Sequence, residues 1–404
     1  MKFGLLKERK VPVDKRVIFS PTMLLEVKRQ FPDAQIVIES SDVRIFKDEE
    51  YIAAGFNVTN NLSDCDVLLG VKEIPVNALI ANKSYFFFSH TIKKQAHNQK
   101  LLQAIIDKNI TLYDHEVVVD ANKKRLIGFG RYAGIVGTYN AFRAFGQKFE
   151  LFNVPKAETL EYKEALAERL KRPVMPPVKI VVTGKGKVGM GAKELLDAVR
   201  IKEVSVENFL TKIYDSPVYT QIDVLDYNKR IDGTVPESCT DFFKNPEQYV
   251  SDFERFANTA DIYVAGHFYA NEAPKILTRD MLRSKHNKIK VVADVSCDVN
   301  AAVDSTLRTS TIAEPFYGYN PSTGEEVDMH HPAAIVVMAV DNLPCELPRD
   351  SSEGFGEMFL KHVIPAFFNV DKDDILKKAT IVKDGRLTER FNYLSDYINT
   401  NVPQ

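Results

Sequence analysis

The stretch Val178-Lys179-Ile180-Val181-Val182-Thr183-Gly184-Lys185-Gly186-Lys187-Val188-Gly189-Met190-Gly191-Ala192 decides how the second half of this 404-residue chain folds. An apolar run leads into the pattern G-x-G-x-x-G, and a helical segment over 193–200 follows. In that order the first glycine permits a tight turn, the second lets the backbone approach a pyrophosphate, and the third lets the helix pack closely on the strand. Without the flanking strand and helix, the pattern would indicate no more than a structural glycine turn. With them it predicts a dinucleotide site, formed by Gly184, Gly186, Lys187, Val188 and Gly189.

A dinucleotide site of this kind also needs an acid for the adenosine ribose, at the end of the second strand. The best second strand is 218–222, so Asp223 is the candidate and Asp215 the alternative. A solvated loop acid explains either residue equally well. An acid at this place repels the additional phosphate of NADP, so we expect NAD, with NADP as the alternative.

Strand-like and helix-like segments alternate in both halves of the chain. This pattern favours an α/β fold with mostly parallel sheets and helices on both faces. The length favours two domains, and the charged, proline-rich segment 155–177 is typical of a boundary. Helical patterns cover 99–108, 134–149 and 355–368. The expected strands are 36–38, 67–71, 85–88 and 110–113 in the first half, and 179–183, 262–265, 290–294 and 334–340 in the second.

Composition excludes several classes of protein. Hydrophobic residues make up 45% and charged residues 27% of the chain, as in a packed globular protein. The formal net charge of -2 favours neither nucleic acid nor an anionic membrane. No apolar run approaches the roughly 18 residues of a membrane span, and the first residues do not form a secretory signal. The four cysteines form no C-x-x-C pair, so we expect no metal site and a reducing, cytoplasmic location.

Three ionisable residues follow three of the expected strands in the first half. Lys72 ends one strand, His90 follows the next, and Glu116 follows a third. Ligands of open α/β sheets bind at the carboxyl ends of the strands. A surface lysine and a structural histidine would explain the first two residues taken singly. Together the three predict an acid–base site. A pair further along, His330-His331, could ligate metal or substrate, although a polar turn explains it as well.

Blocks of sequence along nearly the whole chain resemble one known superfamily. It comprises alanine dehydrogenases, transhydrogenases and saccharopine dehydrogenases, and the lysine-forming saccharopine dehydrogenase branch is the most similar. The blocks that carry the resemblance are Gly4-Leu5-Leu6-Lys7-Glu8-Arg9-Lys10, Asp14-Lys15-Arg16-Val17, Gly70-Val71-Lys72-Glu73-Ile74-Pro75, Phe88-Ser89-His90-Thr91-Ile92-Lys93-Lys94-Gln95, Leu112-Tyr113-Asp114-His115-Glu116, 125–134, 293–298 and 341–349.

The resemblance implies roles for individual residues. Lys72 and His90 match an acid–base pair. Arg16 and Arg125 match residues that hold substrate carboxylates, for which a guanidinium fork is suited. Glu73, Gln95 and Glu116 match polar residues that line the substrate site or tune its charges. Asp341 matches an acidic residue that lies near the nicotinamide end of the cofactor, and Asn342 and Leu343 follow it as further cofactor-binding candidates.

The resemblance also implies two Rossmann-like domains with the active site in the cleft between them. The substrate-side domain would comprise 1–150 and about 350–404, and the dinucleotide domain 151–349. The implied activity is NAD-dependent oxidation of saccharopine to lysine and 2-oxoglutarate by a monomer or small homo-oligomer. The alternatives are an alanine dehydrogenase or opine-like enzyme of the same superfamily, and a catalytically silent nucleotide-binding regulator. The chain departs from the branch at 201–252, which is long and polar, and at 315–321 and 330–332, which resemble lysine–oxoglutarate reductases.

Overall fold

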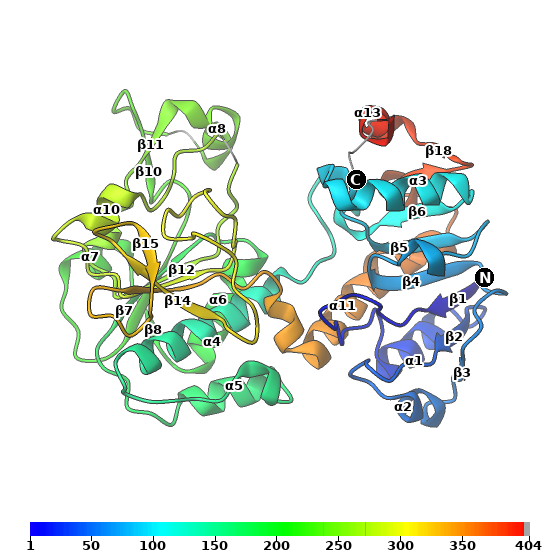
Figure 1. Cartoon of the computed structure of the whole chain (residues 1–404), viewed down its shortest axis with the longest axis horizontal. Coiled ribbons are helices and arrows are strands. Elements are labelled where there is room, and N and C mark those ends of the chain that lie inside the picture. Colours follow the sequence, from blue (N-terminus) through cyan, green and yellow to red (C-terminus); the bar gives the residue numbers. More distant parts are fainter. Residues whose placement is uncertain (237, 271, 400–404) are drawn as a thin grey trace. The chain divides into compact units, whose positions relative to one another are not determined.

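The computed structural model describes residues 1–236, 238–270 and 272–399, and the chain forms two compact units (Figure 1). Unit 1 comprises Met1–Phe129 together with Pro348–Gln404, and unit 2 comprises Gly130–Leu347. The boundary therefore lies between Phe129 and Gly130, whereas the sequence places it near residue 150. The long helix that begins at Gly130 belongs to unit 2 because it packs within that unit's core.

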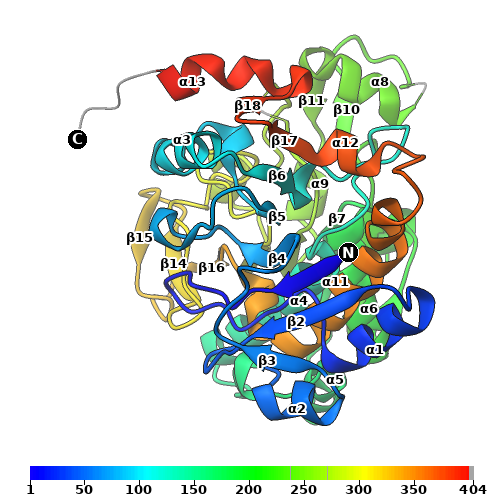
Figure 2. The ribbon, with the colours of Figure 1, turned by 90° about the vertical axis from the view of Figure 1, so that its right-hand side faces the viewer.

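Unit 1 contains an eight-stranded sheet in the order β18-β17-β6-β5-β4-β1-β2-β3. The six strands from β6 to β3 are parallel, whereas β17 and β18 are antiparallel additions at one edge. Figure 2 shows β1 in the middle of this sheet, between β4 and β2. The strands are β1 (Lys2–Leu5), β2 (Gln35–Glu39), β3 (Asn57–Thr59), β4 (Val67–Lys72), β5 (Ser84–Phe88), β6 (Thr111–Asp114), β17 (Thr380–Lys383) and β18 (Arg386–Leu387).

The helices of unit 1 come from both ends of the chain. They are α1 (Pro21–Gln30), α2 (Asp48–Ala53), α3 (Gln99–Asp107), α11 (Pro348–His362), α12 (Ile375–Ala379) and α13 (Ser395–Asn399). The Ser20 hydroxyl accepts the Met23 N–H at the start of α1, and Pro21 occupies the first turn, where no N–H is needed. The chain returns to unit 1 at Pro348, which starts α11 earlier than the hydrophobic periodicity over 355–368 predicts.

Unit 2 contains a second eight-stranded sheet, in the order β15-β14-β16-β13-β12-β7-β9-β8. The six strands from β16 to β8 are parallel, whereas β14 pairs antiparallel with β16 and β15 pairs antiparallel with β14 at one edge. Both sheets thus confirm the predicted α/β class, with antiparallel edges that the sequence pattern did not indicate. The strands are β7 (Lys179–Thr183), β8 (Lys202–Glu203), β9 (Val218–Ile222), β12 (Ile262–Ala265), β13 (Val291–Asp294), β14 (Phe316–Asn320), β15 (Glu325–Val327) and β16 (Ile335–Met338).

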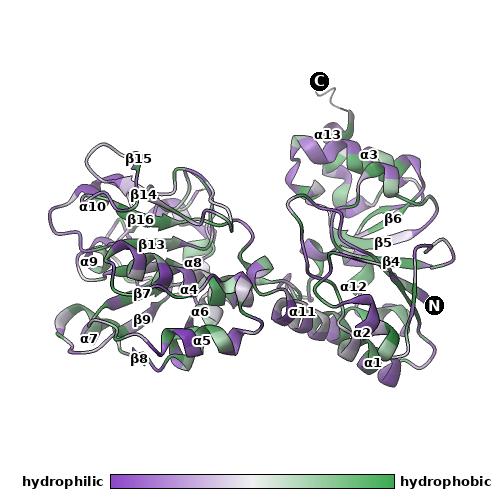
Figure 3. Ribbon diagram, turned by 60° about the horizontal axis from the view of Figure 1, so that its bottom comes forward, coloured by the Kyte–Doolittle hydropathy of each residue, from purple (hydrophilic) through white to green (hydrophobic). Residues whose placement is uncertain are grey.

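The helices of unit 2 are α4 (Gly130–Lys148), α5 (Lys163–Leu170), α6 (Lys187–Ala198), α7 (Val206–Thr211), α8 (Cys239–Lys244), α9 (Glu254–Ala257) and α10 (Arg279–Arg283). The segment expected as a boundary thus contains α5, whose Leu166, Ala167 and Leu170 are buried in the core of unit 2. The long polar segment after α6 contains a separate two-stranded antiparallel sheet of β10 (Asn228–Arg230) and β11 (Tyr249–Ser251). Figure 3 shows hydrophobic residues concentrated on the strands of both sheets.

Candidate functional site

The carboxyl edge of the unit 1 sheet brings three predicted residues to one place. Lys72 is the last residue of β4, while His90 and Glu116 each lie two residues beyond β5 and β6. The three strands are neighbours and parallel, with Lys72 opposite Phe88 in the register of β4 and β5. Parallel strands present their carboxyl ends at the same edge. The predicted acid–base residues therefore share one edge of one sheet.

Buried polar contacts fix the loops that carry these residues. The Asp114 carboxylate accepts hydrogen bonds from the backbone N–H and hydroxyl of Ser89 and from the backbone N–H of Glu116. His115 is fully buried, and its Nε2 lies 2.9 Å from the carbonyl oxygen of Gly70. These two residues tie the ends of β4, β5 and β6 together. His90 itself has a left-handed backbone (φ 55°), which a non-glycine residue adopts only when its surroundings impose it.

Glu116 faces cations on one side of this edge. Its carboxylate lies 3.7 Å from Nδ1 of His90, too far for a direct hydrogen bond, and 3.2 Å from Nζ of Lys93. Burial alone would raise the pKa of Glu116, but His90, Lys93 and Arg125 outweigh it and lower that pKa to about 2. Glu116 is thus a fixed negative charge at neutral pH.

Glu73, directly after Lys72, supplies a second carboxylate. One of its oxygens pairs with Nζ of Lys10. Burial raises the pKa of Glu73, but the hydrogen bond from Lys10 and the charge of His90 bring it below its ordinary value. The other oxygen of Glu73, like Oε2 of Glu116, is buried without a hydrogen-bond partner in the described structure. Two carboxylate oxygens at this edge therefore remain able to accept hydrogen bonds from an ammonium group.

Arg16 is oriented by Asp14. Its Nε and Nη2 donate to the two Asp14 carboxylate oxygens at 3.0 Å and 2.6 Å, and its guanidinium lies 4.2 Å from the centre of the Phe129 ring. The Arg16 side chain is only 2% exposed. Burial would raise the pKa of Asp14, yet Arg16 and Lys72 lower it to about 2. The charge of Lys72 therefore acts on the buried Asp14–Arg16 pair.

Arg125 and Gln95 differ in how closely they join this edge. The Arg125 Nε donates to the carbonyl oxygen of Ile127 at 3.1 Å, and the guanidinium lies 5.3 Å from the centre of the Phe88 ring. Arg125 is exposed, and no carboxylate of the described residues forms an ion pair with it. Gln95 is exposed as well, and its contacts are with Asn98 and Tyr397 rather than with Lys72 or His90.

The carboxyl edge of the unit 2 sheet has a different chemistry, built from glycines. Gly184 follows β7 with a left-handed backbone (φ 91°), and a Cβ there would lie 2.7 Å from the carbonyl oxygen of Gly266, which follows β12. Gly186 precedes the first residue of α6, and a Cβ there would meet nothing within 4 Å. The space beside Gly186 and the N–H groups that begin α6 at Lys187 and Val188 fit a pyrophosphate.

The remaining glycines serve close packing. A Cβ on Gly189 would lie 1.9 Å from the carbonyl oxygen of Gly184, so the helix could not approach the turn. Gly134 on α4 and Gly191 on α6 would each place a Cβ 1.9 Å from a backbone oxygen of the facing helix. The turn itself is held by Gln221, whose Nε2 donates to the Gly184 carbonyl oxygen at 2.8 Å. A tight turn and a close helix therefore occur together, as the pattern predicts.

The predicted ribose acid lies beside this turn. Asp223 directly follows β9, the parallel neighbour of β7, with Thr183 opposite Ile222. Asp215 precedes β9 and therefore lies at the opposite edge of the sheet. Asp341 and Asn342 follow β16 at the same edge as the turn, three strands away from β7, and Leu343 is buried in the core beneath them. The cofactor residues predicted in unit 2 thus lie along its carboxyl edge.

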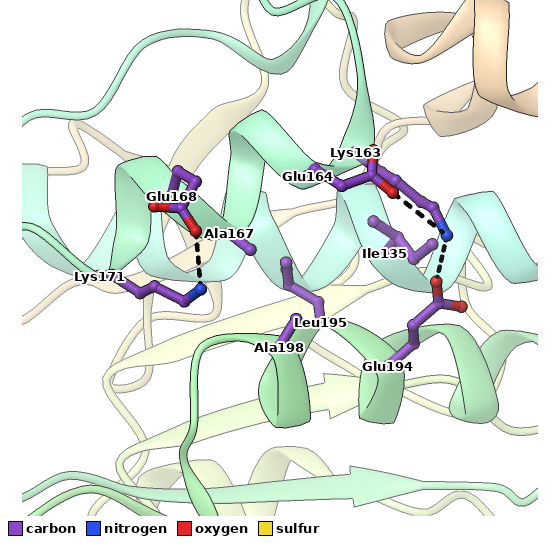
Figure 4. A pocket seen from close by; sticks show the side chains of 9 residues that line it. All are labelled: Ile135, Lys163, Glu164, Ala167, Glu168, Lys171, Glu194, Leu195 and Ala198. Carbon is purple, nitrogen blue, oxygen red and sulfur yellow. Dashed lines mark hydrogen bonds and ion pairs between the residues drawn. The ribbon is translucent and has the colours of Figure 1, made fainter.

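Not every hollow of the surface belongs to these edges. Figure 4 shows a pocket of unit 2 between α4, α5 and α6, lined by apolar side chains and two ion-paired lysines. Lys163 lies 2.8 Å from Glu194, and Lys171 lies 2.8 Å from Glu168. The pocket contacts the far half of α6 rather than its beginning, so its place and its satisfied charges do not suit a cofactor phosphate.

Comparison with known proteins places the chain in a family. It matches the alanine dehydrogenase/PNT N-terminal domain over residues 4–136 and the alanine dehydrogenase/PNT C-terminal domain over residues 169–390. The chain belongs to the alanine dehydrogenase/PNT family. The predicted superfamily and the predicted class of protein, an oxidoreductase, are thereby confirmed. Among the described residues, no helix combines the length and apolar composition that a membrane crossing requires.

Individual relatives are similar over most of the chain. An alpha-aminoadipic semialdehyde synthase from Arabidopsis thaliana is 26% identical over 89% of this chain, which spans only 38% of that relative. A lysine-forming, NAD-dependent saccharopine dehydrogenase from Yarrowia lipolytica is 25% identical, with 89% of this chain and 90% of the relative covered. Among solved structures, an L-alanine dehydrogenase covers 98% of this chain at 18% identity with a TM-score of 0.63.

Sequence reasoning missed two kinds of residue at the unit 1 edge. It gave no role to Asp114 and His115, which fasten the strand ends, or to Glu8, whose carboxylate accepts the backbone N–H groups of Val71 and Lys72. A signal existed for the first two, because Asp114-His115-Glu116 is a polar run directly after an apolar strand. The partners of Glu8 lie more than sixty positions away, and no local pattern reveals them.

Proposed function

We propose that this chain is a nicotinamide-nucleotide-dependent amino-acid dehydrogenase that oxidises saccharopine to lysine and 2-oxoglutarate, with NAD preferred over NADP. The observation that carries the proposal is the unit 1 edge. It combines Lys72 and His90 with two carboxylates that keep an unpartnered buried oxygen. A substrate that carries an amine beside carboxylates suits this edge, because its amine can donate hydrogen bonds to the free carboxylate oxygens and its proton can pass to Lys72 or His90. The glycine turn of unit 2 supports binding of the dinucleotide.

The proposed roles follow from the charges at the edge. When bound, the cofactor accepts a hydride from the substrate carbon that bears the secondary amine. Lys72 Nζ or the His90 imidazole takes the proton of that amine, which leaves an imine. The same pair gives and takes the protons as water adds and the carbon–nitrogen bond breaks. Glu116, lying 3.7 Å from His90, stabilises the imidazolium whenever the proton is on that ring.

Recognition of the substrate rests on complementary charges. Arg125 is exposed with its guanidinium beside the Phe88 ring, and its planar fork suits a carboxylate. The unpartnered oxygens of Glu73 and Glu116 suit an ammonium group. Because Arg16 is already bound to Asp14, we assign it a structural role in that buried ion pair as well as the carboxylate contact that the resemblance implies. In this proposal Gln95 lies at the entrance through which the substrate reaches the site.

A cavity of about 350 Å³ beside Glu73 favours a substrate with more than one carboxylate. Arg9, Lys10 and Lys100 lie in its lining together with His97. Arg9 pairs with Glu39, and Lys10 with Glu73, whereas no ion pair occupies Lys100 among the described residues. Saccharopine carries distal carboxylates that could reach such a place, and alanine does not. This cationic lining is why we rank saccharopine above alanine.

An initial-rate assay of NADH formation at alkaline pH tests the function. Saccharopine and L-alanine would be compared as substrates, each with NAD and with NADP. We expect turnover of saccharopine with NAD. Turnover of alanine alone would keep the enzyme class and discard the substrate, and NAD binding without turnover of any amino acid would favour a regulator.

A further inference from the structure

Glu8 joins the end of β1 to the end of β4 through its side chain. Its Oε1 accepts the backbone N–H of Val71 at 2.7 Å, and its Oε2 accepts the backbone N–H of Lys72 at 2.9 Å. The residue is only 8% exposed. Both carboxylate oxygens are thus used on two consecutive peptide groups, the second of which belongs to the proposed acid–base lysine.

The backbone alone cannot supply these two contacts. β1 pairs with β4 only as far as Leu5 opposite Leu69, and the next ladder bond, from the Leu6 N–H to the Leu69 carbonyl oxygen, is the last from that side. β4 nevertheless continues to Lys72, and on its other side the register with β5 shifts between Leu69 and Lys72. Buried backbone N–H groups require partners. The Glu8 carboxylate takes the place of the missing strand.

The surroundings of Glu8 couple it to the charges of the site. Burial and the charge of Asp14 raise the pKa of Glu8 to about 8, even though the N–H groups of Val71 and Lys72 and the charge of Arg16 act in the opposite direction. The charge of Lys72 in turn lowers the pKa of Asp14. The groups facing Glu8 are therefore Asp14 and Arg16 from the following segment and Lys72 from β4.

We propose that Glu8 is a positioning residue that holds the backbone at Lys72, and so sets where Nζ of Lys72 meets the substrate amine. This inference rests on the proposed role of Lys72. A carboxylate that accepts two adjacent N–H groups fixes both the place and the rotation of that peptide. Displacement of a catalytic group by about 1 Å can lower a rate by about 100-fold, so the end of β4 is a place where such a clamp matters.

Glu39 offers a matched control. It is buried at the end of the neighbouring strand β2, and its carboxylate accepts the backbone N–H of Lys7 at 2.9 Å and pairs with Arg9. Glu39→Gln therefore removes a buried carboxylate that accepts a backbone N–H in the same sheet, but one that does not hold Lys72. A merely structural role predicts equal effects of Glu39→Gln and Glu8→Gln on activity.

The test measures kcat, KM for NAD and the pH profile of kcat, with saccharopine and NAD, for the full-length wild type, Glu8→Gln, Glu8→Asp and Glu39→Gln. We expect kcat of Glu8→Gln to fall by about 10- to 100-fold, its alkaline limb to move, and KM for NAD to stay unchanged. Glu8→Asp, a milder change that keeps the carboxyl group, should fold and shift kcat in the same direction. Glu39→Gln should match the wild type.

Equal kcat and pH profiles for the Glu8 variants and Glu39→Gln would overturn the inference while leaving the proposed function intact. A separate control, Lys72→Met, distinguishes the two failures. If the wild type turns over no amino acid, or if Lys72→Met is fully active, the proposed function fails first. If Lys72→Met is inactive and both Glu8 variants retain wild-type kinetics, only the role of Glu8 is wrong.

Discussion

The two units use the same arrangement of strands for different chemistry at the carboxyl edge. In unit 1 the edge presents ionisable side chains, with Lys72, His90 and Glu116 at the ends of three adjacent strands. In unit 2 the corresponding edge presents backbone, with Gly184 and Gly186 at the turn after β7. Proton transfer needs side chains with tuned charges, whereas a pyrophosphate needs N–H groups and room. The difference teaches that the strand order supplies a position, and the residues after each strand supply the function.

The largest effect expected at the unit 1 edge follows removal of its base. Lys72→Met should lower kcat by about 100- to 10,000-fold, as expected for loss of general acid–base catalysis, and His90→Gln should lower it in the same direction. Because neither residue belongs to unit 2, NADH affinity measured by fluorescence titration should stay at the wild-type value. Wild-type turnover in both variants would show that the unit 1 edge does not carry out proton transfer.

A smaller effect is expected for the exposed guanidinium of the same edge. Arg125→Ala should raise KM for saccharopine by about 10-fold or more, as expected for loss of a charge-assisted contact, with little change in KM for NAD. Arg131→Ala provides a control, because Arg131 is an exposed arginine of unit 2 that pairs with Glu194. Equal KM values for Arg125→Ala and wild type would remove Arg125 from the carboxylate site.

The smallest expected effect is on the pH dependence of stability, and it comes from His115, a buried residue to which we assign no step of the reaction. Burial lowers the pKa of His115 to about 3, so the unfolded chain binds more protons there between about pH 6.5 and pH 3. Stability should therefore fall as pH falls through that window, by at most about 1.4 kcal/mol per pH unit from this group. His115→Phe, which suits the surrounding rings of Phe86 and Phe355, should flatten the acid limb of a denaturation series.

His267 in unit 2 is the counterpart of His115, because burial lowers its pKa to about 4. The remaining acid sensitivity of His115→Phe should then come from unit 2 and from carboxylates. An unchanged acid limb in this variant would mean that His115 is not held neutral by burial.

The sequence predicted the glycine turn and the strands β2, β4, β5, β6, β7, β9, β12, β13 and β16, because both depend on local pattern, whereas β1 and the short or antiparallel strands were not predicted. The run 178–192 contains strand, turn and helix start in one stretch, and the strands at 179–183 and 218–222 lie where the apolar runs place them. Helix starts were predicted less well. α4 and α11 begin earlier than their hydrophobic periodicity because Gly130 and Pro348 carry no apolar signal.

Contacts between distant positions could not be predicted in this way. The sequence places Lys72, His90 and Glu116 after strands, and parallel order then brings them to one edge. It does not indicate that Asp14 binds Arg16 so fully, or that Gln95 contacts Tyr397. Such partners are chosen by tertiary packing, which no spacing of residues along the chain records.

The most direct test of this account is NADH affinity in Gly186→Val beside Lys72→Met and wild type. The chain has no tryptophan, so the fluorescence of bound NADH can be followed without indole emission. A Cβ at Gly186 meets no protein atom within 4 Å, so the variant should fold while its side chain occupies the space for the pyrophosphate. We predict that Gly186→Val loses at least about 100-fold in NADH affinity, while Lys72→Met binds as the wild type does. Wild-type affinity in Gly186→Val, or lost affinity in Lys72→Met, would contradict the assignment of cofactor to unit 2 and of proton transfer to unit 1.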